Sequence, residues 1–241
     1  MFLLLSGSAW GQTTVGVTAS GFLNKVSLVN FTEPGNPTYS FEGIDNRPGF
    51  SVGGFSQTNY TSWLSTRAEI NYTNAGFVNR NSDNILFRRN TINYLQVSQM
   101  IGVRTKTGFS LSTGPMLNIH VGSSSRSRQI TKNAQGKSVP SGRWIASQAL
   151  LSTPASMSAP LSAEGTTKSF VLGWQIQAAC SYKRLSVQVR RQWLFEPVGS
   201  LSFPYSFLKS SRSDFFFSSW QYGLSYTLFE PKAGRHQYEQ P

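Results

Sequence analysis

The chain has 241 residues, of which 39% are hydrophobic and only 13% are charged. Soluble domains carry about 25% charged residues, so this composition argues against an ordinary water-exposed surface. The net charge of +12 would suit nucleic acid, but the cations are scattered in pairs such as Arg88-Arg89 and Arg190-Arg191, and we exclude nucleic acid as a partner. No stretch of about 18 apolar residues occurs, which excludes a transmembrane helix.

The start of the chain predicts a secretory signal. Residues 1–11, "MFLLLSGSAWG", join an apolar stretch to Ala9 and Gly11, small residues where a signal peptidase reads. We expect cleavage after Gly11. Because the stretch is short and lacks a basic start, we also expect the true signal to begin before Met1. The single cysteine, Cys180, cannot form an intramolecular disulfide.

Segments that alternate apolar and polar residues, as β-strands do, follow the signal. They cover residues 13–25, 48–58, 62–76, 90–103, 106–121, 168–182, 184–195 and 214–229. Each is at least as long as the roughly 9 to 11 residues that a tilted strand needs to cross a bilayer. In the clearest segment, 168–182, one face carries Phe170, Leu172, Trp174, Ile176, Ala178, Cys180 and Tyr182, and the other carries Val171, Gly173, Gln175, Gln177, Ala179 and Ser181.

The connections between these segments alternate in length. Short links lie near 59–61, 104–105 and 183, and long ones span 26–47, 77–89, 122–167 and 196–213. Outer-membrane barrels alternate short periplasmic turns with long external loops in this way. We therefore predict an all-β fold, an eight-stranded antiparallel up-and-down transmembrane β-barrel over residues 12–229. Both termini would be periplasmic, with a tail over residues 230–241.

Such a barrel would turn its apolar faces to lipid and fill its interior with polar side chains. Every second residue of a strand points to the same face, and we call this alternation strand parity. It predicts the interior residues Arg67, Glu69, Asn71, Gln96, Asn118, Gln175, Gln177, Gln188, Arg190 and Gln221. Aromatic residues near the strand ends predict interface girdles. These are Phe22, Phe50, Tyr72, Trp193 and Phe215 toward the loops and Trp63, Phe109, Tyr182, Tyr226 and Phe229 toward the turns. Arg191 falls on the lipid face, where we expect it to snorkel to the external interface or to mark a bulge.

Several stretches resemble a known family. They are "TTVGVTASGF", "RPGFSVGGF", "LSTRAEINYTNAG", "INYLQVSQMIGVRT" and "GFSLSTGPMLNI", within residues 13–121. They look like successive hallmarks of the PorT-like outer-membrane β-barrel proteins of Bacteroidota. The resemblance implies an outer-membrane barrel and a link to protein secretion or gliding, without implying one activity.

Little in the sequence suggests chemistry. Of two histidines, His236 lies in the tail, so a catalytic base would be His120, with Ser110, Ser112 or Ser123 to Ser125 as nucleophile. Such a pair would suit a lipid A-modifying barrel enzyme, which we keep as an alternative. One cysteine and two distant histidines lack the spacing of a metal site, and we expect no metal, no cofactor and no enzymatic activity.

The long segment 122–167 is rich in serine and basic. We favour a flexible, solvated loop of low complexity. The alternative is contact with lipopolysaccharide phosphates, acidic polysaccharide or a protein, through Arg126, Arg128, Lys132, Lys137, Arg143 and Trp144.

The sequence thus predicts a non-enzymatic outer-membrane barrel, structural or interacting, as an accessory to a secretion, gliding or outer-membrane assembly complex. Its expected partners are outer-membrane lipid, including lipopolysaccharide, and other proteins of a membrane complex. A soluble lipocalin-like ligand-binding barrel is the second alternative.

Overall fold

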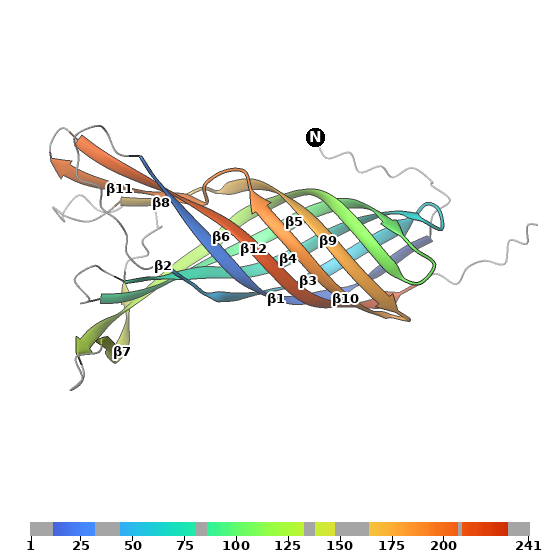
Figure 1. The fold of residues 1–241 in the computed structure, drawn as a ribbon, viewed down its shortest axis with the longest axis horizontal. Helices are drawn as coiled ribbons and strands as arrows, with labels where there is room; N and C mark the ends of the chain where they lie inside the picture. The colour runs from blue at the N-terminus through green and yellow to red at the C-terminus, as the bar shows by residue number, and fades with distance from the viewer. Residues whose placement is uncertain are drawn as a thin grey trace, which may run out of the picture.

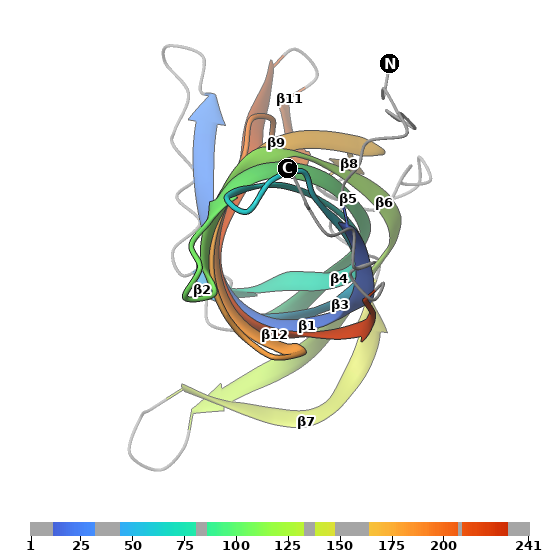
Figure 2. The same cartoon turned by 90° about the vertical axis from the view of Figure 1, so that its right-hand side faces the viewer.

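The computed structural model describes residues 12–31, 44–80, 86–132, 138–147, 164–206 and 209–230. Within these ranges the chain forms strands and no helix. Eight strands make a barrel in the order β1 (Gln12–Phe31), β3 (Pro48–Asn59), β4 (Leu64–Arg80), β5 (Leu86–Arg104), β6 (Phe109–Lys132), β9 (Phe170–Tyr182), β10 (Leu185–Leu194) and β12 (Lys209–Phe229). Each pairs with its neighbours antiparallel, and β1 pairs with both β3 and β12, which closes the ring (Figures 1 and 2). The predicted eight-stranded antiparallel barrel is confirmed.

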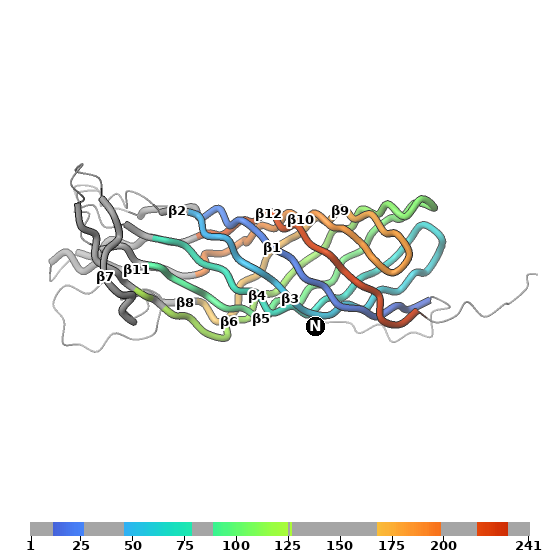
Figure 3. Tube along the Cα trace, turned by 90° about the horizontal axis from the view of Figure 1, so that it is seen from below, coloured from blue at the N-terminus to red at the C-terminus, as the bar shows by residue number. Residues whose placement is uncertain are grey.

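Three short turns lie at one end of the barrel, which we call the turn end. They occupy residues 60–63, 105–108 and 183–184. In the first, the amide of Leu64 donates to Thr61 Oγ1 at 2.9 Å. In the second, Gly108 takes a φ of 89°, a conformation open to glycine but costly for residues with a Cβ. Because β1 begins and β12 ends at this end, both described ends of the chain lie beside the turns (Figure 3).

At the opposite end, the loop end, strands continue where the sequence predicted loops. The strand β6 runs to Lys132 and pairs with β7 (Ser138–Ser147). The strand β12 pairs with β11 (Gly199–Ser206), which pairs with β8 (Glu164–Thr167), and β2 (Ile44–Asn46) pairs with β4. The prediction of an irregular loop over 122–167 is therefore wrong for residues 122–132, 138–147 and 164–167. Residues 122–132 and 138–147 are rich in serine and do not alternate regularly between apolar and polar residues, so periodicity predicts no strand there.

The two faces of each barrel strand differ as the parity predicted. Along β9, Phe170, Leu172, Trp174 and Ile176 are exposed, whereas Val171, Gly173, Gln175 and Gln177 are buried. The exterior exposes large apolar side chains from every barrel strand, while most buried polar side chains of the described residues point inward. We call this exterior the apolar belt. No helix long and apolar enough to cross a membrane occurs in the described ranges.

Candidate functional site

The barrel interior holds all the predicted interior residues. Their side chains come from β4, β5, β6, β9, β10 and β12, and each residue is 0–7% exposed. The structure brings them together as one buried polar layer rather than as a lining of open water. This layer is the candidate functional site, because its contacts decide whether the lumen can pass a solute.

A buried charge cluster crosses the layer. Arg67 Nε donates to Glu69 Oε1 at 2.6 Å, and Arg190 Nη2 donates to Glu69 Oε2 at 2.6 Å. Asn71 Nδ2 donates to the same oxygen at 3.0 Å. In the ring of eight strands, β4 and β10 are four strands apart in either direction, so Arg190 reaches Glu69 from the opposite wall. We call Arg67, Glu69 and Arg190 the charge triad. Together they carry two positive charges and one negative charge.

An amide network lies on the loop-end side of the triad. Gln192 Nε2 donates to Gln175 Oε1 at 3.1 Å and to Gln96 Oε1 at 3.3 Å, and its Oε1 accepts from Gln221 Nε2 at 2.7 Å. Gln96 Nε2 in turn donates to Asn118 Oδ1 at 3.1 Å. The sequence prediction omitted Gln192, although it has the same parity as Gln188 and Arg190. Strand parity alone could therefore have identified the centre of this network.

Two cavities flank the middle of the lumen. The turn-side cavity has about 70 Å³ and is lined by Arg67, Gln177 and several hydroxyl side chains. The loop-side cavity has about 40 Å³ and is lined by Asn24, Tyr94 and Gln192, among others. A water molecule needs about 10–15 Å³ of such volume, so the loop-side cavity has room for a few. There, water would satisfy Asn24 Nδ2 and Tyr94 Oη, buried atoms that have no hydrogen-bond partner.

The residues between the two cavities form a septum. We define the septum as Glu69, Asn71, Gln175 and Arg190, which line neither cavity and are 0–3% exposed. Because water barely reaches these four side chains, they fill the lumen between the two cavities. The septum therefore closes the middle of the lumen.

Apolar side chains pack inside the loop-end half of the barrel. This cluster comprises Phe22, Ala75, Phe77, Ile92, Tyr94, Val198 and Phe217. The rings of Phe77 and Phe217 meet edge to face with centroids 6.2 Å apart. The prediction that Phe22 belongs to an interface girdle is wrong, because its side chain is buried in this cluster while Leu23 is exposed. Two adjacent apolar residues left the parity of β1 ambiguous at that point.

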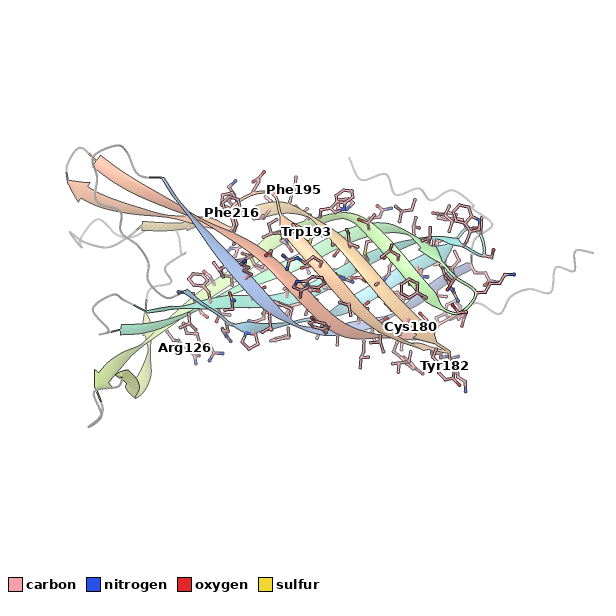
Figure 4. All side chains as sticks on the ribbon, viewed as in Figure 1. Arg126, Cys180, Tyr182, Trp193, Phe195 and Phe216 are labelled. Carbon is pink, nitrogen blue, oxygen red and sulfur yellow. The ribbon has the colours of Figure 1, made fainter. Side chains whose placement is uncertain are left out.

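The other girdle predictions fall mainly on exposed positions. Trp63, Phe109, Tyr182, Tyr226 and Phe229 are exposed toward the turn end, and Phe50 and Tyr72 toward the loop end. Trp193 is partly exposed, and of Phe215 only the backbone is described. Figure 4 shows Cys180 and Tyr182 near the turn end, with Trp193 and Phe195 farther toward the loop end.

Arg191 lies on the outer face within the apolar belt. Its guanidinium stands over the rings of Trp220 and Trp193, at 5.2 and 5.7 Å from their centroids. Its Nη2 also donates to Ser218 Oγ at 3.3 Å, a residue on the loop-end side of Trp220. The register of β10 with both neighbours is continuous here, so the predicted alternative of a bulge is wrong. The side chain instead reaches toward the loop end, as snorkelling requires.

The proposed catalytic pair does not assemble among the described residues. His120 packs edge to face against Tyr94, and its Nε2 has no hydrogen-bond partner. Ser112 lies eight residues away on the same strand, which at 3.3 Å per residue is about 26 Å, and its Oγ points to Met100 Sδ at 3.8 Å. His236 lies outside the described residues.

The predicted contact residues of the third loop are placed only in part. Arg126 is exposed in β6 near the loop end (Figure 4). Of Arg128 and Lys132 in β6, and of Arg143 and Trp144 in β7, only the backbone is described. Lys137 lies outside the described residues, as do the predicted signal, residues 1–11, and residues 231–241 of the predicted tail.

No protein-family model matches the chain, and curated protein sequences give no match. Among solved structures, the chain is similar to the outer membrane protein OprG from Pseudomonas aeruginosa, with 8% identity, a TM-score of 0.47 and coverage of 90% of this chain and 96% of that one. It is also similar to Neisserial surface protein A, with 11% identity, a TM-score of 0.40 and coverage of 88% of this chain and 96% of that one. It is similar as well to the outer membrane protein AlkL in lipid bilayers, with 11% identity, a TM-score of 0.41 and coverage of 97% of this chain and 99% of that one. These identities and scores are low.

Proposed function

We propose that this chain is an outer-membrane β-barrel whose lumen does not conduct solutes and whose termini are periplasmic. The observation that carries the proposal is the sidedness of the barrel, with apolar side chains outside and a buried ion-pair septum inside. In a bilayer every backbone polar group must be paired within the protein, which a closed barrel achieves. A soluble lipocalin-like barrel would leave the apolar belt in water, which is unfavourable over so large an area.

The role that fits a sealed barrel is structural or interactive rather than enzymatic. The septum argues against transport along the lumen, and His120 has no serine hydroxyl bonded to it in the described part of the chain. The strands β7, β8 and β11 lie at the loop end of the barrel (Figure 1). Their position would make them available to a partner outside the bilayer.

The finer assignment rests on the motifs that resemble PorT-like barrels of Bacteroidota. On that basis we propose an accessory subunit of a secretion, gliding or outer-membrane assembly complex. Its partners would be outer-membrane lipid, including lipopolysaccharide, and proteins of that complex. Contact would involve Arg126, Arg128, Lys132, Lys137, Arg143 and Trp144. Copurification in mild detergent followed by mass spectrometry tests the protein partner, and recovery of the barrel alone would contradict the accessory role.

Membrane insertion has a direct test. The protein should be extracted from outer membranes only with detergent, and its band should shift on gels after heating. In vesicles of brominated lipid, the fluorescence of Trp174 and Trp220 should be quenched, because both side chains are exposed on the belt. A protein recovered soluble from the periplasm, with unquenched tryptophans, would contradict the proposal.

Two further measurements separate the sealed barrel from its rivals. Inserted into planar bilayers, the protein should give no steady ion conductance, and open-channel steps would contradict a closed lumen. The substitution His120→Ala should leave the lipid A acylation pattern of the cell unchanged. An altered pattern would instead favour the lipid A-modifying enzyme.

A further inference from the structure

The charge triad is not electrically balanced. Among the residues whose side chains the structure describes, Arg67, Glu69 and Arg190 are the buried charged ones, and together they carry a net charge of +1. Their side chains are 8%, 0% and 3% exposed. A buried charge is costly unless it is paired. The barrel interior therefore holds one positive charge without a counter-charge of its own.

The unbalanced charge has a free hydrogen-bond donor. Arg67 uses its Nε for Glu69 and stacks its guanidinium over the ring of Phe55, 3.9 Å from the centroid. Its Nη2 is buried and has no partner. By contrast, Arg190 is occupied, since its Nε and Nη2 donate to Gln177 and its Nη2 also to Glu69. The charge and the free donor thus coincide on one side chain.

Arg67 lines the turn-side cavity of about 70 Å³. Serine and threonine hydroxyls line the same space, from Thr14, Ser65, Ser110, Ser112, Ser181, Ser186 and Thr227. Arg104 and Lys183, both exposed, bring two more cations to the cavity, and Glu230 brings one carboxylate. Arginine and hydroxyl donors are the groups that bind phosphate and carboxylate oxygens.

We propose that the turn-side cavity binds one small oxyanion, a phosphate or a carboxylate, that enters from the turn end. One negative charge beside Arg67 would neutralise the triad, and a rotation of the guanidinium toward the cavity would bring its buried Nη2 to the anion. The septum lies directly beyond Arg67 on the loop-end side, so the anion stops there and does not pass through the barrel. The site is a binding pocket open to the compartment that holds the turns.

The test uses the full chain, purified in a detergent without phosphate groups. Inorganic phosphate is titrated against chloride at constant ionic strength, with isothermal calorimetry and the temperature of the gel-mobility shift as readouts. We expect saturable heat and a rise in the unfolding temperature with phosphate. Glycerol 3-phosphate is the second probe, and tighter binding of the ester than of phosphate would identify a larger ligand that carries the anion.

Three variants locate the site. Arg67→Met should weaken phosphate binding by about 10-fold or more, since it removes both the buried positive charge and its free donor. Arg104→Met, which touches only the exposed mouth and should fold normally, should weaken it by about 2- to 5-fold. Lys106→Met removes an exposed cation of the same end that does not line the cavity, and it should bind as the native protein does.

Either of two results would overturn the proposal. One is that neither phosphate nor acetate, titrated into the native protein against chloride, gives saturable heat or raises the unfolding temperature. The other is an equal loss of binding in Arg104→Met and Lys106→Met, which would show attraction to the general positive charge of the turn end. Neither result would bear on membrane insertion, which fractionation and quenching measure separately.

Discussion

Arg190 Nη2 lies 2.6 Å from Glu69 Oε2, and this pair joins opposite walls of the barrel through residues 121 positions apart in the sequence. Taking both charges out of water costs several kcal/mol, which the short contact and the neighbouring amides offset. The pair adds little stability over an apolar filling of the same volume. It does fix how the two walls face each other, and it closes the lumen at the same point.

Removal of Glu69 should be far more costly than removal of an exposed carboxylate. Glu69→Gln leaves Arg67 and Arg190 facing each other, buried and without a counter-charge. We expect a loss of about 3–5 kcal/mol in the free energy of unfolding. Urea titration in lipid vesicles, with the folded fraction read from the unheated gel band, measures this loss.

The matched control is Glu196→Gln. Glu196 pairs with Lys168 at 2.7 Å, but the two side chains are 46% and 43% exposed. An exposed ion pair is worth about 0–1 kcal/mol, so this variant should unfold close to the native midpoint. Equal effects of the two substitutions would show that the triad is not shielded from water.

Arg190 and Arg191 are adjacent in sequence but lie on opposite faces of β10. Arg190→Leu deprives Glu69 and Gln177 of a buried donor and should destabilise the barrel by about 3–5 kcal/mol. Arg191→Leu replaces a cation on the apolar belt, where arginine costs up to about 2–4 kcal/mol at the midplane and little near the interface. We expect this variant to be as stable as the native protein or more so in urea titrations. A larger loss for Arg191→Leu than for Arg190→Leu would reverse the assigned faces.

Gly53 leaves room for the septum. A Cβ at this position would overlap the carbonyl oxygen of Ile70 and the side chain of Asn71, which donates to Glu69. Gly53→Ala should therefore destabilise the barrel by about 1–3 kcal/mol, as other over-packed sites do. At the neighbouring Gly54, a Cβ would lie 3.5 Å from the carbonyl oxygen of Gly16, an ordinary contact. Gly54→Ala should change the stability by less than about 0.5 kcal/mol, and the difference between the two midpoints is the measurement.

Much of this fold follows from strand parity. A period of two residues placed Gln175, Gln177 and Arg190 on the buried face, because one face of every membrane strand must be apolar. The same rule failed at Phe22, where Phe22 and Leu23 are adjacent apolar residues. It also missed the strands of the loop end, since residues 122–132 and 138–147 of β6 and β7 do not alternate regularly between apolar and polar residues.

The contacts inside the lumen were less predictable than the residues that make them. Parity puts Glu69 and Arg190 inside, but whether they meet depends on strand order and on the stagger of the walls. The closure of β1 on β12 decides that β4 lies opposite β10. No local pattern in either strand carries this information. The free Nη2 of Arg67 likewise results from how Glu69 is shared between two arginines.

Cys180, the single cysteine of the chain, provides a native probe of the barrel's outer face. Its side chain is exposed on β9, two residues before Tyr182 at the turn end. A nitroxide attached to Cys180 in a reconstituted bilayer should collide more often with oxygen, which concentrates in lipid, than with a water-soluble nickel chelate. In the control, Cys180→Ser with Lys106→Cys, the label sits in the exposed turn 105–108, and the preference should reverse. Power-saturation electron paramagnetic resonance measures both. Stronger relaxation by the chelate at Cys180 would mean that this face meets water, and the belt would then not be a lipid contact.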